Sequence, residues 1–460
     1  MIWTVLWVAV SDARPAKRVE VDPEAVASEL LGRALTTNEA YDELVELCDD
    51  IGHRLTGSPE LERAVEWARD KLAEDGLDAR TETVTVPVWR RNDESATLLA
   101  PVERELDVLG LGWSIGTPPG GLEGEVIVVD DFDHFERLPR SEIEGRMVLW
   151  DVPFSTYGAT VQYRVRGASV AASKGAIASL MRSVTPQSLA TPHTGTQRYA
   201  DDADPIPAMA ITVEDALAMR RWQERGKSVR MKFSMGAETL PDQQSANVVA
   251  DLRGRERPDE YVLLGCHLDS WDVGQGAQDD GAGCVIAMDA ARLISELDVR
   301  PRRSIRVVLF TNEESGLAGG KAFAEAHAGD TYVAALEADT GAGAPEGFRV
   351  DIRRGDDTER LQERALQALQ PWTPLLAPVG ASRLELAYSG ADVGPLVEAT
   401  GTLGLGLIND TSGYWPIHHT PADTIDKVDP ATLRRNVGAV AVMAWMLAES
   451  SDPPLPARTP

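Results

Sequence analysis

Histidine and acidic side chains gather in a few short segments of the second half of the chain. These segments are His267-Leu268-Asp269, Asp279-Asp280, Glu313-Glu314, Asp339 and His418-His419. Imidazole nitrogens together with several carboxylates form a donor set that binds zinc and leaves coordination positions open for a substrate. Each segment alone also has a structural explanation, because acidic residues often cap helices or turns. It is a poor explanation that all five segments arose independently for such structural reasons. The joint occurrence of the five segments therefore predicts a metal site.

The predicted strands explain why these segments should meet. Apolar runs at Tyr261–Cys266, Ser304–Thr311 and Tyr332–Glu337 have the length and composition of buried strands, and helices are predicted at Ala282–Leu297 and Gly316–Ala328. This alternation predicts an α/β fold with a mostly parallel central sheet flanked by helices. Ligands bind beyond the carboxyl ends of such strands. Four of the segments follow or lie close behind a strand end, and a late loop carries the fifth.

Sequence patterns divide the chain into four parts. Residues 23–94 begin the main domain with helices and a strand, and residues 246–450 complete it. Between them, residues 95–245 contain short strands among Gly- and Pro-rich turns, with one helix near Gly167–Leu180. We therefore predict an inserted β-rich domain at 95–245 and a disordered, Pro-rich tail at 451–460.

Composition excludes several classes of function. The chain of 460 residues has 73 Asp and Glu against 45 Lys and Arg, a net charge of −28, so no nucleic-acid partner is expected. No apolar run is long enough for a membrane span. The three cysteines match neither a disulfide framework nor a zinc finger. The apolar start, Ile2–Val10, is either the remnant of a signal peptide or a frayed chain start.

Several strings of the sequence, taken in order, resemble those of a known enzyme family. They are His267–Gly276, Asp279-Asp280-Gly281, Asn312-Glu313-Glu314 and His418-His419-Thr420, with weaker support from Ser389–Pro395 and Cys48–Leu55. This set resembles the dinuclear zinc exopeptidases that include aminopeptidase Y and the glutamate carboxypeptidases, and it is most similar to the plasma glutamate carboxypeptidase subgroup. The resemblance covers residues 30–450 and implies that the insert is a protease-associated domain.

The resemblance implies a site with two zinc ions per chain. In it, His267 and Asp339 would bind one zinc, Glu314 and His419 the other, and Asp279 both. Asp279 is preferred to Asp280 as the bridge because the family pattern places a glycine four residues after the bridging aspartate, and Gly283 fits this spacing.

Further roles are implied for the neighbouring polar residues. Glu313 would be the catalytic carboxylate, which takes a proton from the attacking water and delivers it to the leaving amine. Asp269 would accept a hydrogen bond from the imidazole of His267 and so set its tautomer. His418 would either donate a hydrogen bond to the oxyanion or have a structural role, and the sequence leaves both open.

The predicted activity is hydrolysis of dipeptides or short peptides by a zinc exopeptidase, with a carboxypeptidase or dipeptidase type implied by the subgroup. A zinc aminopeptidase is the main alternative. A transferase with one working zinc, related to glutaminyl cyclases, is less well supported because a full ligand set for two metals is present. A non-catalytic binding ectodomain is the weakest alternative, since every expected ligand type and Glu313 are present.

Recognition of the ends of the substrate is left open. Arg383 and Lys321 are candidates for binding a free carboxylate and Asp392 for binding a free amine, although each has an ordinary surface or loop explanation. Relatives in the subgroup imply a homodimer and a secreted or periplasmic location, with a cytoplasmic location as the alternative.

Overall fold

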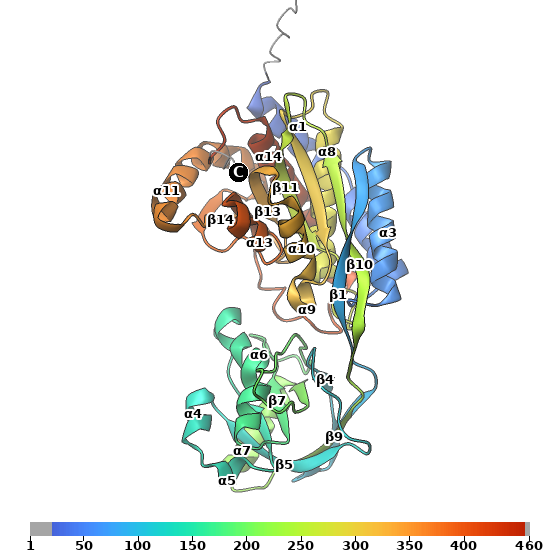
Figure 1. The fold of residues 1–460 in the computed structure, drawn as a ribbon, viewed down its shortest axis with the longest axis vertical. Helices are drawn as coiled ribbons and strands as arrows, with labels where there is room; N and C mark the ends of the chain where they lie inside the picture. The colour runs from blue at the N-terminus through green and yellow to red at the C-terminus, as the bar shows by residue number, and fades with distance from the viewer. Residues whose placement is uncertain (1–20, 456–460) are drawn as a thin grey trace, which may run out of the picture.

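The computed structural model describes residues 21–455 of the chain. Figure 1 shows two units, each built around a sheet, which are joined by the long paired strands β1 (Asp78–Arg90) and β10 (Glu238–Leu252). The segment Ile2–Val10, on which the signal-peptide prediction depends, lies outside the described residues. Within residues 21–455, none of the helices combines the length and hydrophobicity needed to cross a bilayer.

The first unit contains an eight-stranded sheet. Its strands lie in the order β1, β10, β12 (Arg303–Phe310), β11 (Arg257–His267), β13 (Thr331–Glu337), β16 (Leu403–Asn409), β14 (Pro345–Asp351) and β15 (Arg383–Leu386). The four central strands from β12 to β16 are parallel, whereas β1 with β10, β10 with β12 and β14 with β16 pair antiparallel. The α/β fold with a mostly parallel central sheet is therefore confirmed.

Helices cover both faces of this sheet. One face is covered by α1 (Pro23–Ala34), α2 (Glu39–Val45), α3 (Pro59–Glu74), α8 (Ala282–Ser295) and α14 (Pro430–Glu449). The other face is covered by α10 (Ala318–His327) and α13 (Gly394–Thr400). Two further helices, α11 (Thr358–Leu369) and α12 (Thr373–Leu376), precede β15. Because α8 is buried along almost its whole length, the loop that leads into it is held firmly against the sheet.

The register of the parallel strands brings the polar segments to one edge of the sheet. His267, the last residue of β11, lies opposite Phe310 at the end of β12. On the other side of β11, Gly265 lies opposite Glu337, the last residue of β13. The residues that follow these strands therefore leave the sheet at the same level, beyond the carboxyl ends of the strands, where ligands bind in α/β sheets.

The second unit contains another eight-stranded sheet. Its strands lie in the order β3 (Arg104–Leu106), β2 (Glu94–Ala100), β9 (Arg230–Met235), β5 (Leu122–Val129), β6 (Met147–Trp150), β7 (Ala178–Arg182), β8 (Ala208–Ile211) and β4 (Val108–Gly110). Its helices are α4 (Phe132–Arg137), α5 (Arg140–Ile143), α6 (Tyr157–Ser173) and α7 (Val213–Glu224). Strands β5 to β8 are parallel, so this unit has more helix and parallel sheet than a β-rich insert implies.

Three boundaries differ from those predicted. The helix predicted near Gly167–Leu180 ends at Ser173, because Gly175 has φ = 82° and this left-handed conformation ends the helix before β7. Strand β10 begins at Glu238, so residues 238–245 belong to the first sheet and not to the insert. Leu455 is buried in the core of the first unit, which differs from the predicted disordered tail, and residues 456–460 lie outside the described residues.

Candidate metal centre

All five residues predicted as metal ligands lie together at the carboxyl edge of the first sheet. Four come from elements at this edge: His267 ends β11, Asp279 lies in the turn Ala277–Gly281 before α8, Glu314 lies in α9 (Glu313–Gly316), and Asp339 follows β13. His419 comes from the loop between β16 and α14. The sheet register and this one returning loop thus assemble residues that are far apart in the sequence.

Asp279 lies at the middle of the cluster. Its Oδ1 is 3.3 Å from Nε2 of His267, and its Oδ2 is 3.1 Å from Nε2 of His419. Each oxygen of a single carboxylate therefore faces a different imidazole. Although burial opposes ionisation, the contacts with the two histidines hold the pKa of Asp279 well below its usual range. This geometry fits a carboxylate that is shared by two cations.

The other two carboxylates complete the two sides of the cluster. Oδ1 of Asp339 is 3.5 Å from Nε2 of His267, and Oε2 of Glu314 is 3.1 Å from Nε2 of His419. Two of the oxygens in the cluster, Oδ2 of Asp279 and Oε1 of Glu314, are buried without a hydrogen-bond donor. Buried carboxylate oxygens that lack a hydrogen bond and converge with imidazole nitrogens fit zinc as the bound ion, because they leave lone pairs for a cation.

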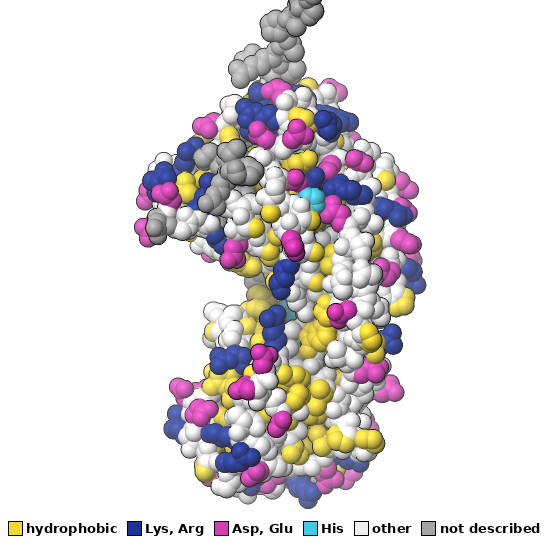
Figure 2. Space-filling model, in the orientation of Figure 1, with side chains coloured by type: hydrophobic (Ala, Val, Ile, Leu, Met, Phe, Trp, Pro, Cys, Tyr) yellow, Lys and Arg dark blue, Asp and Glu magenta, His cyan; other side chains and the backbone are white. Residues whose placement is uncertain are grey.

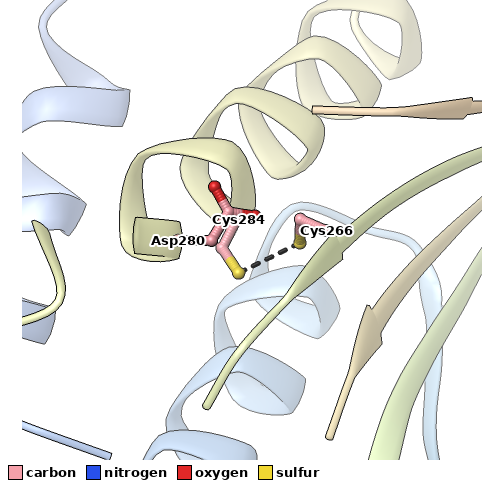
Figure 3. A group of neighbouring side chains, drawn as sticks. All are labelled: Cys266, Asp280 and Cys284. Atoms are coloured by element: carbon pink, nitrogen blue, oxygen red, sulfur yellow. Dashed lines mark hydrogen bonds between the residues drawn. The ribbon is translucent and has the colours of Figure 1, made fainter. Parts of the chain in front are cut away.

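The adjacent residue Asp280 points elsewhere. Its oxygens accept hydrogen bonds from the backbone N–H groups of His267, at 3.2 Å, and Gly283, at 3.1 Å. Figure 3 shows Asp280 at the start of α8 beside the buried pair Cys266 and Cys284, whose sulfurs are 3.0 Å apart as free thiols. A Cβ on Gly283 would lie 1.9 Å from the carbonyl oxygen of Ala338, so only glycine lets α8 approach β13 this closely.

A hydrogen bond from Nδ1 sets the tautomer of His267. Its Nδ1–H donates to the backbone oxygen of Asp269 at 2.9 Å, which leaves Nε2 free to face the carboxylates. The acceptor thus differs from the side chain predicted from the sequence, since Oδ1 of Asp269 is 3.9 Å from Nδ1. The Asp269 carboxylate instead accepts from the backbone N–H of Glu313 at 3.0 Å and from the hydroxyl of Thr56 at 3.1 Å.

A tight turn lets Glu313 and Glu314 point in different directions. The single turn α9 is flanked by Asn312 and Leu317, each with φ = 65°. Glu314 is buried beside His419, whereas Glu313 is less buried, and both line the cavity described below. Burial raises the pKa of Glu313 well above its usual range, and the nearby Asp339 and Glu314 carboxylates add to this shift. A raised pKa suits a carboxyl group that must both accept and release a proton.

His418 lies against the same cluster. Its ring stacks on that of His419 with centroids 3.5 Å apart, and its Nε2 is 3.5 Å from Oδ2 of Asp279. Burial lowers the pKa of His418 well below its usual range, and the neighbouring His419 lowers it further. This shift favours the neutral imidazole of His418, whose Nε2 lies beside the candidate ligand Asp279.

The second unit contacts two of the candidate ligands, which sequence reasoning missed. The backbone N–H of Thr194 donates to the carbonyl oxygen of His419 at 3.1 Å, and Nδ1 of His419 lies 3.3 Å from the carbonyl oxygen of Thr194. The hydroxyl of Thr196 donates to the carbonyl oxygen of Glu314 at 2.6 Å. Nothing in the sequence around these threonines, which lie in a turn-rich segment, predicts that they contact His419 and Glu314. The segment from Thr194 to Thr196 therefore orients the Glu314–His419 side of the cluster.

Asp423 is a second residue that sequence reasoning missed. Its carboxylate accepts hydrogen bonds from the backbone N–H groups of Gln278, at 2.7 Å, and Asp279, at 3.1 Å. Asp423 lies only four residues after His419, so the loop that supplies one ligand also anchors the turn that supplies Asp279. The nearness of Asp423 to His418-His419 is visible in the sequence, but its hydrogen bonds to the backbone of Gln278 and Asp279 are not.

Replacing Thr196 with valine is expected to lower zinc affinity by about 2–10-fold, the size of one lost hydrogen bond. Valine removes the hydroxyl at nearly constant side-chain volume. The carbonyl oxygen of Glu314 then loses the hydrogen bond from residue 196, while the Glu314 side chain itself is unchanged. A competition titration with a chelator measures the change. Thr191→Val is the matched control, because that hydroxyl donates to the carbonyl oxygen of Leu189, within its own loop and away from the candidate ligands. Equal affinities in the two variants would contradict the expected role of Thr196.

A cavity of about 370 Å³ lies over the cluster, between the two units. From the first unit it is lined by candidate ligands, Glu313 and the aromatic residues Tyr414 and Trp415. From the second unit it is lined by Tyr157, Arg164, Val165, Thr196 and Arg198. Figure 2 shows the surface hollowed between the units. Cavities of this size hold small ligands.

Of the residues proposed for recognising the ends of the substrate, none lines this cavity. Arg383 is at the edge strand β15 and pairs with Glu346 at 3.0 Å. Lys321 is exposed and donates to the carbonyl oxygen of Gly316 at 2.8 Å. Asp392 is buried, with both carboxylate oxygens lacking a hydrogen bond.

The chain matches known proteins along nearly its whole length. Residues 247–444 match the model of peptidase family M28. The chain is 39% identical to carboxypeptidase Q of Mus musculus over 418 residues, which are 90% of this chain and 87% of that protein. The crystal structure of a peptidase M28 precursor from Shewanella amazonensis SB2B superposes with a TM-score of 0.88 at 36% identity, covering 95% of this chain and 99% of the other. A zinc aminopeptidase from Bacillus subtilis has the same fold, with a TM-score of 0.64 at 18% identity over 90% of this chain and 96% of the other.

These matches agree with the resemblance found in the sequence. The identity of 39% extends across both units and not only across the segment that carries the candidate ligands. The superposition with the Shewanella structure likewise includes nearly all of both chains. The chain belongs to peptidase family M28 and is a zinc exopeptidase.

Proposed function

We propose that this chain is a dinuclear zinc exopeptidase that hydrolyses dipeptides or short peptides and acts as a carboxypeptidase or dipeptidase. The observation that carries the proposal is the position of Asp279, whose two oxygens face His267 and His419 at 3.3 and 3.1 Å. Carboxypeptidase Q, with 39% identity to this chain, supports the carboxypeptidase type.

Each zinc ion would have its own pair of ligands. His267 and Asp339 would hold one ion, Glu314 and His419 the other, and Asp279 would bind both. Zinc held there would act as a Lewis acid toward a water molecule and toward the scissile carbonyl. The residues of the chain must then orient the peptide, move protons and exclude bulk water.

Glu313 is the residue proposed to move the proton. It lines the cavity next to the ligands, and its backbone N–H is held by the Asp269 carboxylate at 3.0 Å. A carboxylate oxygen of Glu313 accepts the proton of the attacking water and later delivers it to the amine nitrogen of the leaving product. Asp269 acts through its position: its main-chain oxygen sets the tautomer of His267, and its side chain holds the turn that carries Glu313.

The second unit is proposed to be an inserted, protease-associated-type domain that forms one wall of the substrate cavity. Its strands lie within residues 94–235, between the paired strands β1 and β10. The contacts of Thr194 and Thr196 with the backbone of His419 and Glu314 support a role in assembling the site. A homodimer and a secreted or periplasmic location stay predictions, which sedimentation and cell fractionation would test.

The test combines metal analysis with a small substrate panel on the full chain. About two zinc ions per chain, and cleavage of free dipeptides that is abolished by a chelator and restored by zinc, are expected. Cleavage that survives N-terminal blocking supports the carboxypeptidase type, whereas cleavage of an aminoacyl amide and loss on N-terminal blocking would indicate an aminopeptidase. Absence of both metal and turnover after zinc is added back would overturn the proposal in favour of a binding protein.

A further inference from the structure

Two of the three cysteines of the chain lie side by side next to the metal centre. Cys266 directly precedes His267 at the end of β11, and Cys284 lies in the first turn of α8. Both side chains are fully buried, with a relative exposure of 0%. Their sulfurs are 3.0 Å apart, which is closer than two sulfur atoms in ordinary packing contact (Figure 3). The third cysteine, Cys48, lies elsewhere, in the helical segment Glu46–Ile51.

The two thiols form only weak interactions with their surroundings. The S–H group of Cys266 donates to Sγ of Cys284, and the S–H group of Cys284 donates to the carbonyl oxygen of His267 at 3.1 Å. Thiols are weak donors and weak acceptors, so these hydrogen bonds contribute little. A disulfide has an S–S distance of about 2.05 Å, so the sulfurs would have to approach by about 1 Å. Modest rotations of the two side chains supply a movement of this size while the backbone stays in place.

The fold keeps β11 and α8 in contact independently of the two sulfurs. Strand β11 is a central strand, between β12 and β13. Helix α8 is buried along almost its whole length, and Gly283 lets its first turn approach the end of β13. Two thiols that are held together in this way have a high effective concentration for each other. A bond between them is therefore favoured over pairing with a thiol of another molecule.

A third metal ion is the other chemistry that this group of side chains could support. An oxygen of Asp280 lies within 4.8 Å of both sulfurs. The oxygens of Asp280 already accept hydrogen bonds from the backbone N–H groups of His267 and Gly283, whereas Asp279 and Glu314 each have a buried oxygen that lacks one. The two sulfurs alone are fewer than the four ligands of a structural zinc site. The contacts therefore favour a bond between the sulfurs over a bound metal ion.

We propose that Cys266 and Cys284 form a disulfide bond when the chain is made in an oxidising compartment, such as the predicted secreted or periplasmic location provides. Each thiol loses its hydrogen, and the two sulfurs bond to each other. The two protons and two electrons pass to a disulfide oxidant such as oxidised glutathione, whose S–S bond breaks to give two thiols. Because both sulfurs are buried in the folded chain, the exchange takes place during folding, before α8 is packed against β11.

The bond would fasten together the two elements that carry His267 and Asp279. His267 directly follows Cys266, and the turn that contains Asp279 leads into the helix that contains Cys284. Nε2 of His267 and Oδ1 of Asp279 are 3.3 Å apart, so a covalent link between the two elements lies close to this contact. It would keep the end of β11 and the start of α8 together whether or not a metal ion is bound. The inference goes beyond the proposed function, because it does not depend on the reaction.

The test counts the thiols of the full chain after export to the periplasm of a bacterial host. The protein is unfolded in guanidinium chloride with a chelator and is labelled with a maleimide, with or without prior reduction. We expect one label per chain without reduction, on Cys48, and three labels after reduction. Cleavage after lysine and arginine leaves Cys266 and Cys284 in a single peptide that ends at Arg292. Mass spectrometry should find this peptide unlabelled and two hydrogens lighter than its reduced form.

Two variants control for the identity of the pair. Without reduction, Cys48→Ala should carry no label and keep the lighter peptide, whereas Cys284→Ala should carry two labels, on Cys48 and Cys266. The labels on the wild type decide the question even if Cys284→Ala does not fold. Three labels on the unreduced wild type, or a disulfide that includes Cys48, would overturn the proposal. Three labels together with a third metal ion per chain would assign the pair to metal binding instead. None of these measurements depends on turnover, so each outcome leaves the exopeptidase proposal to its own test.

Discussion

Glutamine in place of Glu313 should lower kcat by about 10²–10⁴-fold while the zinc content of the protein stays the same. The amide has nearly the shape of the carboxyl group but cannot accept the proton of the attacking water. Glu313 is not among the residues whose oxygens lie against His267 or His419, so the metal cluster should remain complete. Steady-state kinetics on a free dipeptide, with metal analysis of the same sample, measures both quantities.

The matched control for this variant is Glu325→Gln. Glu325 is an exposed residue of α10, the helix that follows the Glu313 turn. Its replacement changes the charge of the chain in the same way and should leave kcat within about twofold, because most surface substitutions have small effects. Turnover close to that of the wild type in Glu313→Gln would exclude Glu313 as the proton-transfer residue. Loss of turnover together with loss of zinc would assign Glu313 to metal binding.

Replacing Asp279 with alanine is expected to remove metal from both sides of the cluster and to abolish activity. Asp279 is the residue whose carboxylate faces both His267 and His419, so its loss leaves each side one ligand short. Alanine at Asp339 should remove metal from one side only, because Asp339 faces His267 alone. Zinc content per chain, measured after dialysis against dilute chelator, should therefore fall further in Asp279→Ala than in Asp339→Ala.

Asp280→Asn provides the control for Asp279→Ala. The oxygens of Asp280 accept backbone hydrogen bonds from His267 and Gly283, so this variant should lose stability, by about 1–3 kcal/mol, and keep its zinc. Circular dichroism establishes that each variant is folded before its metal is counted. Two zinc ions retained in Asp279→Ala, or zinc lost from Asp280→Asn with the fold intact, would show that the bridging residue has been assigned wrongly.

Local patterns were sufficient to predict the first sheet and the positions of the candidate ligands along it. Strands ending near Cys266, Phe310 and Glu337 were visible as short apolar runs, and polar residues stand just beyond each of them. Parallel strands joined by helices place their carboxyl ends at one edge, so neighbouring strand ends meet wherever the exact boundaries fall. For this reason the meeting of the segments that carry His267, Asp279-Asp280, Glu313-Glu314 and Asp339 could be predicted without coordinates, whereas the choice of one acid from each pair came from the family resemblance.

The direction of each side chain could not be predicted in the same way. The Asp269 carboxylate was expected to accept from His267, but its main-chain oxygen does so and the side chain holds Glu313. Asp279 was preferred to Asp280 through a family pattern and not through any difference between two adjacent carboxylates. Which of two neighbouring acids faces the cluster depends on backbone angles of single turns, which composition and periodicity do not specify.

The sequence by itself determined the fold class and the edge of the sheet where the acidic and histidine segments meet, because these follow from short-range periodicity and strand order, and the family resemblance selected the donors within those segments. Tertiary structure alone decided that the second unit closes over this edge. Thr194, Thr196 and Arg164 reach the site from segments that precede His267 by many residues and have no pattern of their own. Such contacts depend on how the two units pack against each other. That packing is set by shape and by hydrogen bonds across the whole interface, which no local stretch of sequence encodes.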